Sequence, residues 1–476
     1  MIKKIGIYCM GVAAIGLAAT SCNGDPLSES ISVDYSSTQV KTFSLKSNSK
    51  VLNNLDSVYF SIDLANARIF NADSLPFGTK INKLQVELTT DNCSTVELRY
   101  PRPGQNDSIV DFLTHDSDSI DFSRGPVTLH LVSYDKVAQR DYKIYVNVHK
   151  TISDSLYWDL DNPAKLPTSL SDPIAQRTVL FNNNYCTLTL DGSGNTCISK
   201  TEHPAENGTP VATSLPFIPR VETFTATNSA LFILDNDGKL YTSTNGSSWS
   251  STGQTWQSIT APYGDTLTGI AETNGTLFHV TYPASTTSPV KDDFPVSGNS
   301  QAIRYASDWG QQPQIITVGG LRADGIPTPS VWAYDGNTWI CINKATPMAA
   351  EGITIAPYYC CQTDTNTWIA TTRSVLLAMG GRMKDGKIIE SNYISYDLGF
   401  HWEEAPKVMQ PSALFPALSD AQAFIVNHEF NSRAVRPITE WDTPFIYLYG
   451  GNKVNRTLSP TIYRGVIKRL EFKPLQ

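Results

Sequence analysis

The sequence predicts an all-β protein, with a β-sandwich in its N-terminal part and a β-propeller of about six blades after it. Two observations predict this class. Short runs of alternating polar and apolar residues recur along the chain with little helical periodicity, as expected for half-buried strands. From about residue 176 onward, a unit of strand, glycine pair, polar loop and second strand repeats. Repetition over several tens of residues indicates a propeller or a solenoid.

Composition limits the kind of protein and its partners. The chain has 476 residues, of which 41% are hydrophobic and 17% charged. This balance permits a buried core and argues against general disorder. The net charge is −8, and it becomes −10 if the two residues Lys3 and Lys4 are removed with a leader. An acidic chain repels phosphate backbones, which argues against nucleic acid as a partner.

Residues 1–21 are predicted to form a lipoprotein signal peptide. Two lysines precede an apolar run from Ile5 to Ala19, shorter than the roughly 20 residues that span a bilayer. The Ala-Thr-Ser-Cys sequence that ends at Cys22 resembles a bacterial lipobox, and this resemblance implies acylation of Cys22. The start of the chain is similar to Bacteroidetes lipoproteins, which implies a lipid anchor in the outer membrane, facing the periplasm or the cell surface. The alternative is an ordinary signal peptide with an incidental cysteine.

The next elements are a tether, a sandwich and a linker. Residues 22–40 are polar and Ser-rich, and are predicted to be a tether. Residues 41–150 contain alternating runs such as VYFSIDL, KLQVELT and YKIYVNVH, separated by turn residues, and predict an antiparallel sandwich. The order of the runs resembles the Ig-like modules of Bacteroidetes lipoproteins, which implies a spacer role. Residues 151–175 are predicted to connect the two domains.

Residues 176–476 are predicted to form the propeller. Three apolar strands end in two glycines, at Gly319-Gly320, Gly380-Gly381 and Gly450-Gly451, and each is followed by a polar loop and a Tyr-containing strand. These segments resemble the kelch repeat, although the third lacks the Trp of the other two. Glycine suits a strand in a crowded place that has no room for a side chain. About 300 residues at about 50 per blade give six blades, and seven is the alternative.

One short segment, SYDLGFHW, resembles the Asp-box of sialidases and other propellers, and its residues are Ser395, Asp397, Gly399 and Trp402. The resemblance implies a turn between the third and fourth strands of a blade, on the face opposite the usual ligand site. In such a turn Asp accepts backbone N–H groups, and Trp packs between sheets. These four residues are therefore predicted to be structural. A second copy, with Thr242 and Thr244 before its Gly and Trp, has Thr in place of Asp.

Recognisable catalytic motifs are missing from the sequence. The arginine-bearing Phe/Tyr-Arg-Ile/Leu-Pro motif of sialidases is absent, as are GxSxG, HExxH and a phosphate-binding loop. The seven histidines show no metal-ligand spacing and no CxxC occurs, so neither a metal nor a cofactor is expected. Cys186 and Cys197 flank LTLDGSGN, a turn signal between two strands, and a disulfide across that hairpin is predicted.

A basic residue follows each glycine pair: Arg322, Arg382 and Lys453. If the three loops converge on one face, these cations can bind a carboxylate, a sulfate or an acidic sugar. The alternative is that each cation pairs with a carboxylate of its own blade. Trp309 is a candidate platform for a sugar ring, as is the Tyr358-Tyr359 pair, unless these rings lie in the core.

The sequence favours a noncatalytic module that binds a glycan or a protein. The alternative is a glycan-active enzyme, a hydrolase or a lyase, whose catalytic residues have no recognisable pattern. A glycosidase needs two carboxylates at roughly 5–10 Å. Glu440, Asp442 and Asp308 are the first acids to consider, although no pattern selects a pair.

Overall fold

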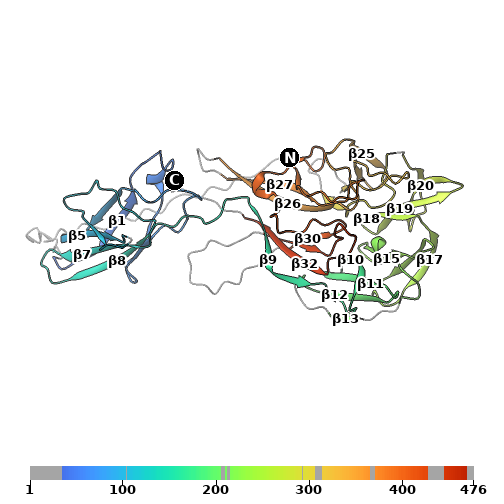
Figure 1. Ribbon diagram of the computed structural model, residues 1–476, viewed down its shortest axis with the longest axis horizontal. Helices are drawn as coiled ribbons and strands as arrows, with labels where there is room; N and C mark the ends of the chain where they lie inside the picture. Colours follow the sequence, from blue (N-terminus) through green and yellow to red (C-terminus); the bar gives the residue numbers. More distant parts are fainter. Residues whose placement is uncertain are drawn as a thin grey trace, which may run out of the picture.

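The computed structural model describes residues 35–102, 104–204, 209–211, 215–291, 293–305, 314–364, 370–426 and 444–468. Figure 1 shows two lobes along the long axis, one containing β1, β5, β7 and β8, the other containing the sheets from β9 onward. Strands dominate both lobes, so the predicted all-β class is confirmed. In the described part of the chain, none of the helices has the length and apolar character needed to span a membrane. Cys22 lies outside these residues.

The N-terminal lobe is built from two sheets. Six strands form one sheet in the order β2-β3-β8-β7-β5-β6, and β1 pairs with β4 in a second, two-stranded sheet. All pairs are antiparallel except β3 with β8, which run parallel. An immunoglobulin domain divides its strands more evenly between two sheets, so the structure shows an N-terminal β domain and the Ig-like description stays an interpretation. The strands are β1 Val40–Leu45, β2 Ser61–Asp63, β3 Arg68–Phe70, β4 Val86–Thr90, β5 Cys93–Tyr100, β6 Ser108–Asp111, β7 Val127–Ser133 and β8 Gln139–Tyr145.

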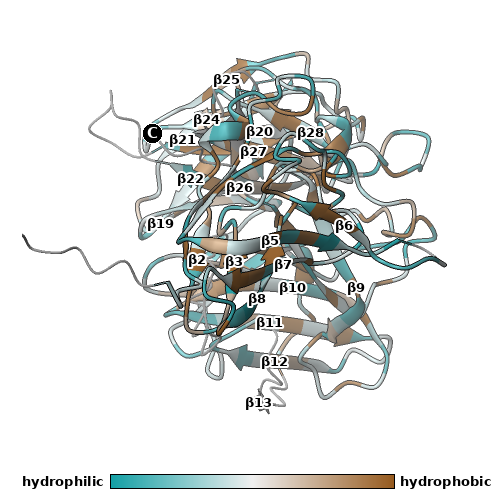
Figure 2. Cartoon of the chain, turned by 90° about the vertical axis from the view of Figure 1, so that its left-hand side faces the viewer, coloured by the Kyte–Doolittle hydropathy of each residue, from teal (hydrophilic) through white to brown (hydrophobic). Residues whose placement is uncertain are grey.

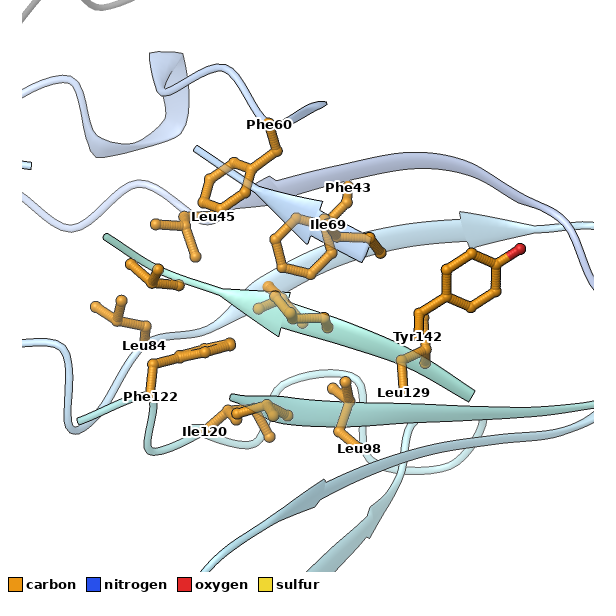
Figure 3. Packing of buried hydrophobic residues seen from close by; sticks show 14 of the residues in the cluster. Phe43, Leu45, Phe60, Ile69, Leu84, Leu98, Ile120, Phe122, Leu129 and Tyr142 are labelled. Atoms are coloured by element: carbon orange, nitrogen blue, oxygen red, sulfur yellow. The ribbon is translucent and has the colours of Figure 1, made fainter. Parts of the chain in front are cut away.

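Alternation along the strands creates the core of this lobe. In β7, Val127, Leu129 and Leu131 are fully buried while the residues between them are partly exposed. Polar and apolar colours alternate along the strands of this sheet in Figure 2. Phe43 of the small sheet packs edge-on against Phe60, with ring centroids 4.9 Å apart, above the large sheet (Figure 3). The small sheet therefore covers one face of the large one.

The chain enters and leaves this lobe at opposite ends of its strands. Val40, at the start of β1, pairs with Thr90, close to the turn that leads into Cys93. Cys93 pairs with Ser133, and the neighbouring Val132 pairs with Gln139 at the start of β8. The chain leaves after Tyr145, at the other end of β8. Seven residues of strand separate the two ends by about 20 Å.

The second lobe is a propeller of six four-stranded sheets, which confirms the predicted blade number. Blades 1 to 5 each use four consecutive strands, with the innermost first. Blade 6 uses β30, β31 and β32, and its outermost strand is β9. The strands are β9 Leu156–Lys165, β10 Pro173–Phe181, β11 Asn184–Asp191, β12 Thr196–Thr201, β13 Thr209–Val211, β14 Thr225–Ala226, β15 Leu231–Leu234, β16 Lys239–Ser243, β17 Ser250–Thr255, β18 Ser258–Tyr263, β19 Thr266–Thr273, β20 Thr276–Tyr282, β21 Thr287–Pro289, β22 Ile303–Tyr305, β23 Gln314–Val318, β24 Val331–Tyr334, β25 Trp339–Asn343, β26 Thr354–Thr363, β27 Ala370–Met379, β28 Tyr393–Ser395, β29 Glu403–Glu404, β30 Gln422–Val426, β31 Phe445–Tyr449 and β32 Thr461–Ile467.

The predicted linker 151–175 is wrong for most of its length. It contains β9, which pairs antiparallel with β32 from Leu156↔Ile467 to Lys165↔Thr461, and it ends inside β10. An early strand thus completes the last blade and closes the ring. The pairing joins residues about 300 positions apart, so it leaves no local signal in the sequence.

One apolar cluster fills each of the six interfaces between blades. The cluster between blades 4 and 5, for example, joins Ile316 and Val331 to Ile355 and Leu376. The closing interface between blades 6 and 1 uses aromatic rings, with Tyr185 against Phe424 at 5.2 Å and against Tyr449 at 6.1 Å. These clusters fix how the innermost strands surround the central channel.

The predicted disulfide between Cys186 and Cys197 is also wrong, although the hairpin that carries them exists. β11 pairs with β12 in a register that places Cys186 opposite Lys200 and Cys197 opposite Thr189. Both cysteines are buried and free. Burial raises the pKa of the Cys186 thiol to about 11, so this thiol stays protonated at neutral pH.

Candidate functional site

The three glycine pairs lie where the second strands of blades 4, 5 and 6 end, beside the segments that lead into the innermost strands. A Cβ at Gly319 would lie 2.5 Å from the Ala350 carbonyl oxygen, and one at Gly451 would lie 2.9 Å from Ala421 Cβ. All three pairs have positive φ, for example Gly319 at 65° and Gly451 at 89°. The close approach lets the loops after the pairs reach the end of the central channel.

Two of the three candidate cations, Arg322 and Arg382, already have partners in their own or neighbouring loops. Arg382 follows its glycine pair directly, whereas Arg322 and Lys453 come one residue later, so the three positions are not equivalent. Arg322 forms an exposed ion pair with Asp324 of its own loop, at 2.8 Å. The Arg382 side chain is buried, and its guanidinium donates hydrogen bonds to three backbone carbonyls. Lys453 is exposed.

Arg382 instead fastens two neighbouring loops together. Its Nη1 donates to Gly386 O at 2.8 Å and to Val454 O at 3.0 Å, and its Nη2 donates to Lys453 O at 2.8 Å. The first carbonyl belongs to its own loop in blade 5, and the other two belong to the loop of blade 6. Its hydrogen bonds therefore serve the fold.

The other candidates from the sequence divide in two groups. Tyr358 is buried in the cluster between blades 5 and 6, and its hydroxyl donates to the Pro444 carbonyl. Tyr359 stacks on it and is partly buried, so this pair belongs to the core. The remaining candidates, Trp309, Asp308, Glu440 and Asp442, lie outside the described residues.

The Asp-box-like residues form a turn between β28 and β29, the third and fourth strands of blade 5. Gly399 N–H donates to Ser395 Oγ at 2.8 Å, and His401 N–H donates to Asp397 Oδ1 at 2.8 Å. The Trp402 indole donates to Gly399 O at 3.1 Å, and its ring packs on the cluster between blades 4 and 5. These contacts fit the structural role predicted for the four residues.

The second, Thr-containing turn uses different residues from those predicted. Gly246 N–H donates to Ser243 Oγ at 2.8 Å, and Ser247 N–H donates to Asn245 Oδ1 at 2.8 Å. Ser243 and Asn245 thus take the roles that Thr242 and Thr244 were predicted to take. This turn is one residue shorter before its glycine than the turn at Ser395, which moves the bonding side chains by one position.

A cavity of about 290 Å³ lies at the mouth of the central channel. Its lining comes from the start of β10 in blade 1, from η2 (Val221–Thr223) before blade 2, and from the segments before β26 and β30 in blades 5 and 6. Blades 2 and 5 face each other across a six-membered ring, so a cavity that touches both lies over the axis. We call this cavity the channel mouth. Its charged lining residues are Arg177, Glu222, Glu351, Arg382, Asp420 and Arg456.

Arg177 is a partly buried guanidinium of the channel mouth whose hydrogen-bonding capacity is unused. Among the described residues, no acceptor lies within hydrogen-bonding distance of its side chain. Burial lowers the pKa of Arg177, and the carboxylates of Asp420 and Glu222 oppose this effect. The group remains a cation at neutral pH. The preceding residue, Gln176, is 8% exposed, and its Oε1 accepts no hydrogen bond from the described residues.

Asp420 occupies a backbone position that favours glycine. Its φ is 60°, and the corresponding residues before blades 4 and 5 are Gly298 at 63° and Gly352 at 64°. The three residues are linked around the axis, because Asp420 N–H donates to Gly352 O and Gly352 N–H donates to Gly298 O, each at 2.7 Å. A non-glycine residue in this conformation is uncommon. Here it places a carboxylate in the channel mouth.

Glu351 supplies a second carboxylate next to Asp420. Burial raises the pKa of Glu351 above its usual value, and the negative charge of Asp420 adds to this effect. The nearest cation is Arg456, whose Nη2 lies 3.9 Å from Glu351 Oε1 and whose side chain is 75% exposed. The channel mouth therefore combines donors and acceptors that the protein leaves partly unsatisfied. No group of metal-ligating side chains occurs among the residues with described positions.

Sequence reasoning missed this site because its residues are spread over the whole propeller. Arg177 and Asp420 are 243 positions apart, and no motif surrounds either one. One signal was available: in the three repeats, the residue before blade 6 is Asp420, where the other two copies have Gly298 and Gly352. An alignment of the repeats at that point would have marked Asp420 as a departure.

Two family profiles together match most of the chain. Residues 153–475 match the DUF6242 beta propeller domain, and residues 32–146 match the N-terminal domain of DUF6242, a domain of unknown function. Both profile boundaries place β9 with the propeller. Among curated proteins, none is significantly similar in sequence to this chain.

Several solved structures are similar at low identity. One of YjhT has 11% identity and a TM-score of 0.39, and covers 62% of this chain and 94% of its own. One of AofleA from Arthrobotrys oligospora has 11% identity and a TM-score of 0.38, with 68% and 94% covered. An auxiliary nutrient binding protein from Bacteroides thetaiotaomicron has 11% identity and a TM-score of 0.36, with 80% and 94% covered. At such values the comparison carries nothing about a ligand.

Proposed function

We propose that this chain, which belongs to the DUF6242 family, is a noncatalytic binding protein that takes a glycan at the channel mouth. One observation carries the proposal: Arg177 lines a cavity with hydrogen-bonding capacity that the described residues do not use. Arg177 is partly buried, and a charged group that is withdrawn from water without a protein partner costs stability, so its place in the cavity needs a reason.

The lining favours a ligand rich in hydroxyl groups. A hydroxyl both donates and accepts, so it can satisfy guanidinium donors and carboxylate or amide acceptors in the same cavity. Apolar lining is limited to a few side chains, among them Ile174 and Leu458. The volume of about 290 Å³ lies at the lower end of ligand pockets, so one sugar residue rather than a long chain would fill it.

A glycan array tests the proposal. The chain without its first 22 residues is applied beside an Arg177→Gln variant of the same length. Binding to a set of related glycans is expected for the first, and a loss of about tenfold or more is expected for the second. Equal thermal melting of the two proteins shows that the variant is folded. Absence of binding to every glycan by the folded chain would refute the proposal.

The alternative function is a glycan hydrolase or lyase, and the Glu351–Asp420 pair is the observation that favours it. Two adjacent carboxylates, one with a raised pKa, can divide the acid and base roles of a glycosidase. The two functions differ in the products. If glycans that bind are cleaved on prolonged incubation, and Glu351→Gln abolishes cleavage but keeps binding, the enzymatic function replaces the binding one.

We also propose that the protein is exported and held in the bacterial outer membrane through acylated Cys22. The support is the lipobox resemblance and the N-terminal lobe, whose chain enters and leaves at opposite ends, as a spacer between an anchor and the propeller would require. Cys22→Ala is expected to move the processed protein from the membrane fraction to the soluble fraction. Unchanged membrane partition of a processed variant contradicts the anchor.

A further inference from the structure

We infer that the sugar at the channel mouth is acidic, with a carboxylate held by Arg177 and a hydroxyl group held by Asp420. This inference rests on the proposed function and names the class of glycan. A planar guanidinium binds a planar carboxylate through two parallel hydrogen bonds, and such charge-assisted pairs are stronger than neutral ones.

Arg177 is singled out because the other arginines near the cavity either have acceptors or lie at its exposed rim. Arg382 donates to three carbonyls. Arg220 donates to Glu222 at 3.0 Å and to the Gln257 carbonyl at 2.7 Å. Arg456 lies at the exposed rim, close to Glu351. Arg177 and Arg456 both line the cavity with donors that the described residues leave unused, but Arg456 is 75% exposed whereas Arg177 is partly buried.

The carboxylates beside Arg177 define the rest of the ligand. Asp420 and Glu222 act on its charge, so they repel a ligand that brings only negative charge. A hydroxyl group next to the ligand carboxylate removes this conflict, because it donates a hydrogen bond to the Asp420 carboxylate, whose one contact among the described residues is weak. A sugar acid carries both groups on adjacent carbons. A simple inorganic anion such as sulfate carries acceptors alone.

The backbone at Asp420 supports a ligand role for its carboxylate. Glycine at the two corresponding positions adopts the same φ without strain. The Asp420 side chain has one weak contact within the described residues, from Asn452 Nδ2 at 3.4 Å, which does not account for a non-glycine residue here. Residues kept in such conformations cluster at ligand sites.

Isothermal titration with matched ligands tests the inference. The probes are oligosaccharides that end in glucuronic acid or sialic acid, their neutral counterparts that end in glucose or galactose, and sulfate. We expect an acidic member to bind at least about tenfold more tightly than its neutral partner, with an affinity that falls as salt increases. Arg177→Gln should remove the preference, and Arg177→Lys should restore part of it, since a lysine supplies charge without the bidentate geometry.

Asp420→Gly provides the matched control for the carboxylate. The neighbouring blades carry glycine in this conformation, so the variant is expected to fold and to melt no lower than the parent. It should weaken binding of the acidic sugar and strengthen binding of sulfate. The substitution removes an acceptor for hydroxyl groups and, at the same time, a negative charge that repels anions.

The outcomes separate this inference from the proposed function. If the neutral sugars bind as tightly as the acidic ones, the acidic-sugar inference fails and the glycan-binding function stands. If sulfate matches the acidic sugars in the parent chain, the site is a plain anion site and the inference also fails. If no saccharide binds a folded chain, both fail.

Discussion

The two faces of the propeller use the same residue types in opposite ways. On the face of the β28–β29 turn, Asp397 finds its partners within four residues, at Ser395 and His401. At the channel mouth, Asp420 and Arg177 come from blades 6 and 1 and leave hydrogen-bonding capacity unused by the described residues. A position at the channel mouth does not by itself make a residue available to a ligand, because Arg382 lies there and its guanidinium already donates to backbone carbonyls. Unused hydrogen-bonding capacity, rather than charge or position, is what separates the proposed binding residues from the structural ones.

The largest expected effect sharpens the contrast between Arg382 and Arg322. Arg382→Ala should lower the free energy of unfolding by about 2–3 kcal/mol, because a buried guanidinium with three carbonyl partners is lost. Arg322→Ala is the control, and it should cost no more than about 0.5 kcal/mol, since its ion pair is exposed. Denaturant unfolding measures both. Equal losses of stability in the two variants would mean that the hydrogen bonds of Arg382 do not hold the two loops together.

A smaller effect is expected on the opposite face. Asp397→Ala should lower the free energy of unfolding by about 1 kcal/mol at neutral pH, a modest value because the side chain is 41% exposed. Burial acts to raise the pKa of Asp397, but hydrogen bonds from His401 outweigh it and the net pKa is lowered. A lowered acid pKa stabilises the fold above the ordinary Asp pKa, and this stabilisation disappears as pH falls through the lowered value.

The difference in melting temperature between Asp397→Ala and its parent should therefore become smaller as the pH is lowered. Thermal melting measured across pH checks this. Glycan binding by the folded variant should stay as in the parent. If melting is unaltered and binding is lost, the turn belongs to a ligand site and the contrast between the two faces breaks down.

The smallest expected effect is a gain in stability rather than a loss, and it concerns Glu351. The pKa of Glu351 is raised, so the folded state holds this proton more tightly than the unfolded chain does. Stability from this group is present in acid and is lost as pH rises through the raised pKa. Glu351→Gln should accordingly raise stability at pH 7 by a few tenths of a kcal/mol, up to about 1 kcal/mol. The gain should vanish in acid, where the parent carboxyl is protonated.

Glu403→Gln is the matched control for Glu351→Gln, because Glu403 is exposed on β29. It should leave the melting temperature at pH 7 unchanged. A Glu351→Gln variant that melts lower than its parent at pH 7 would show that the ion pair with Arg456 stabilises the fold by more than burial of the Glu351 carboxylate destabilises it. The raised pKa of Glu351 would then overstate the cost of burying this carboxylate.

Local features of the chain were readable from the sequence alone. Period-2 alternation predicted the strands of both lobes, because the side chains of a strand point to opposite faces. The glycine pairs predicted crowded strand ends, since only glycine fits where a Cβ would lie 2.5 Å from a carbonyl oxygen. The turn at Ser395 was readable because its hydrogen bonds span four residues. Each of these is settled within one strand or one turn.

Register and ring closure were decided only by the tertiary structure. The register in which β11 pairs with β12 separates Cys186 from Cys197, although the hairpin itself was predicted. β9 joins the last blade because a propeller gains apolar burial at its sixth interface when the ring closes. That closure also brings Arg177 and Gln176 of the first blade to Asp420 of the last. The sequence determined the blades, and the contact between the first and last of them created the channel mouth, because groups 243 positions apart meet only when a ring is complete.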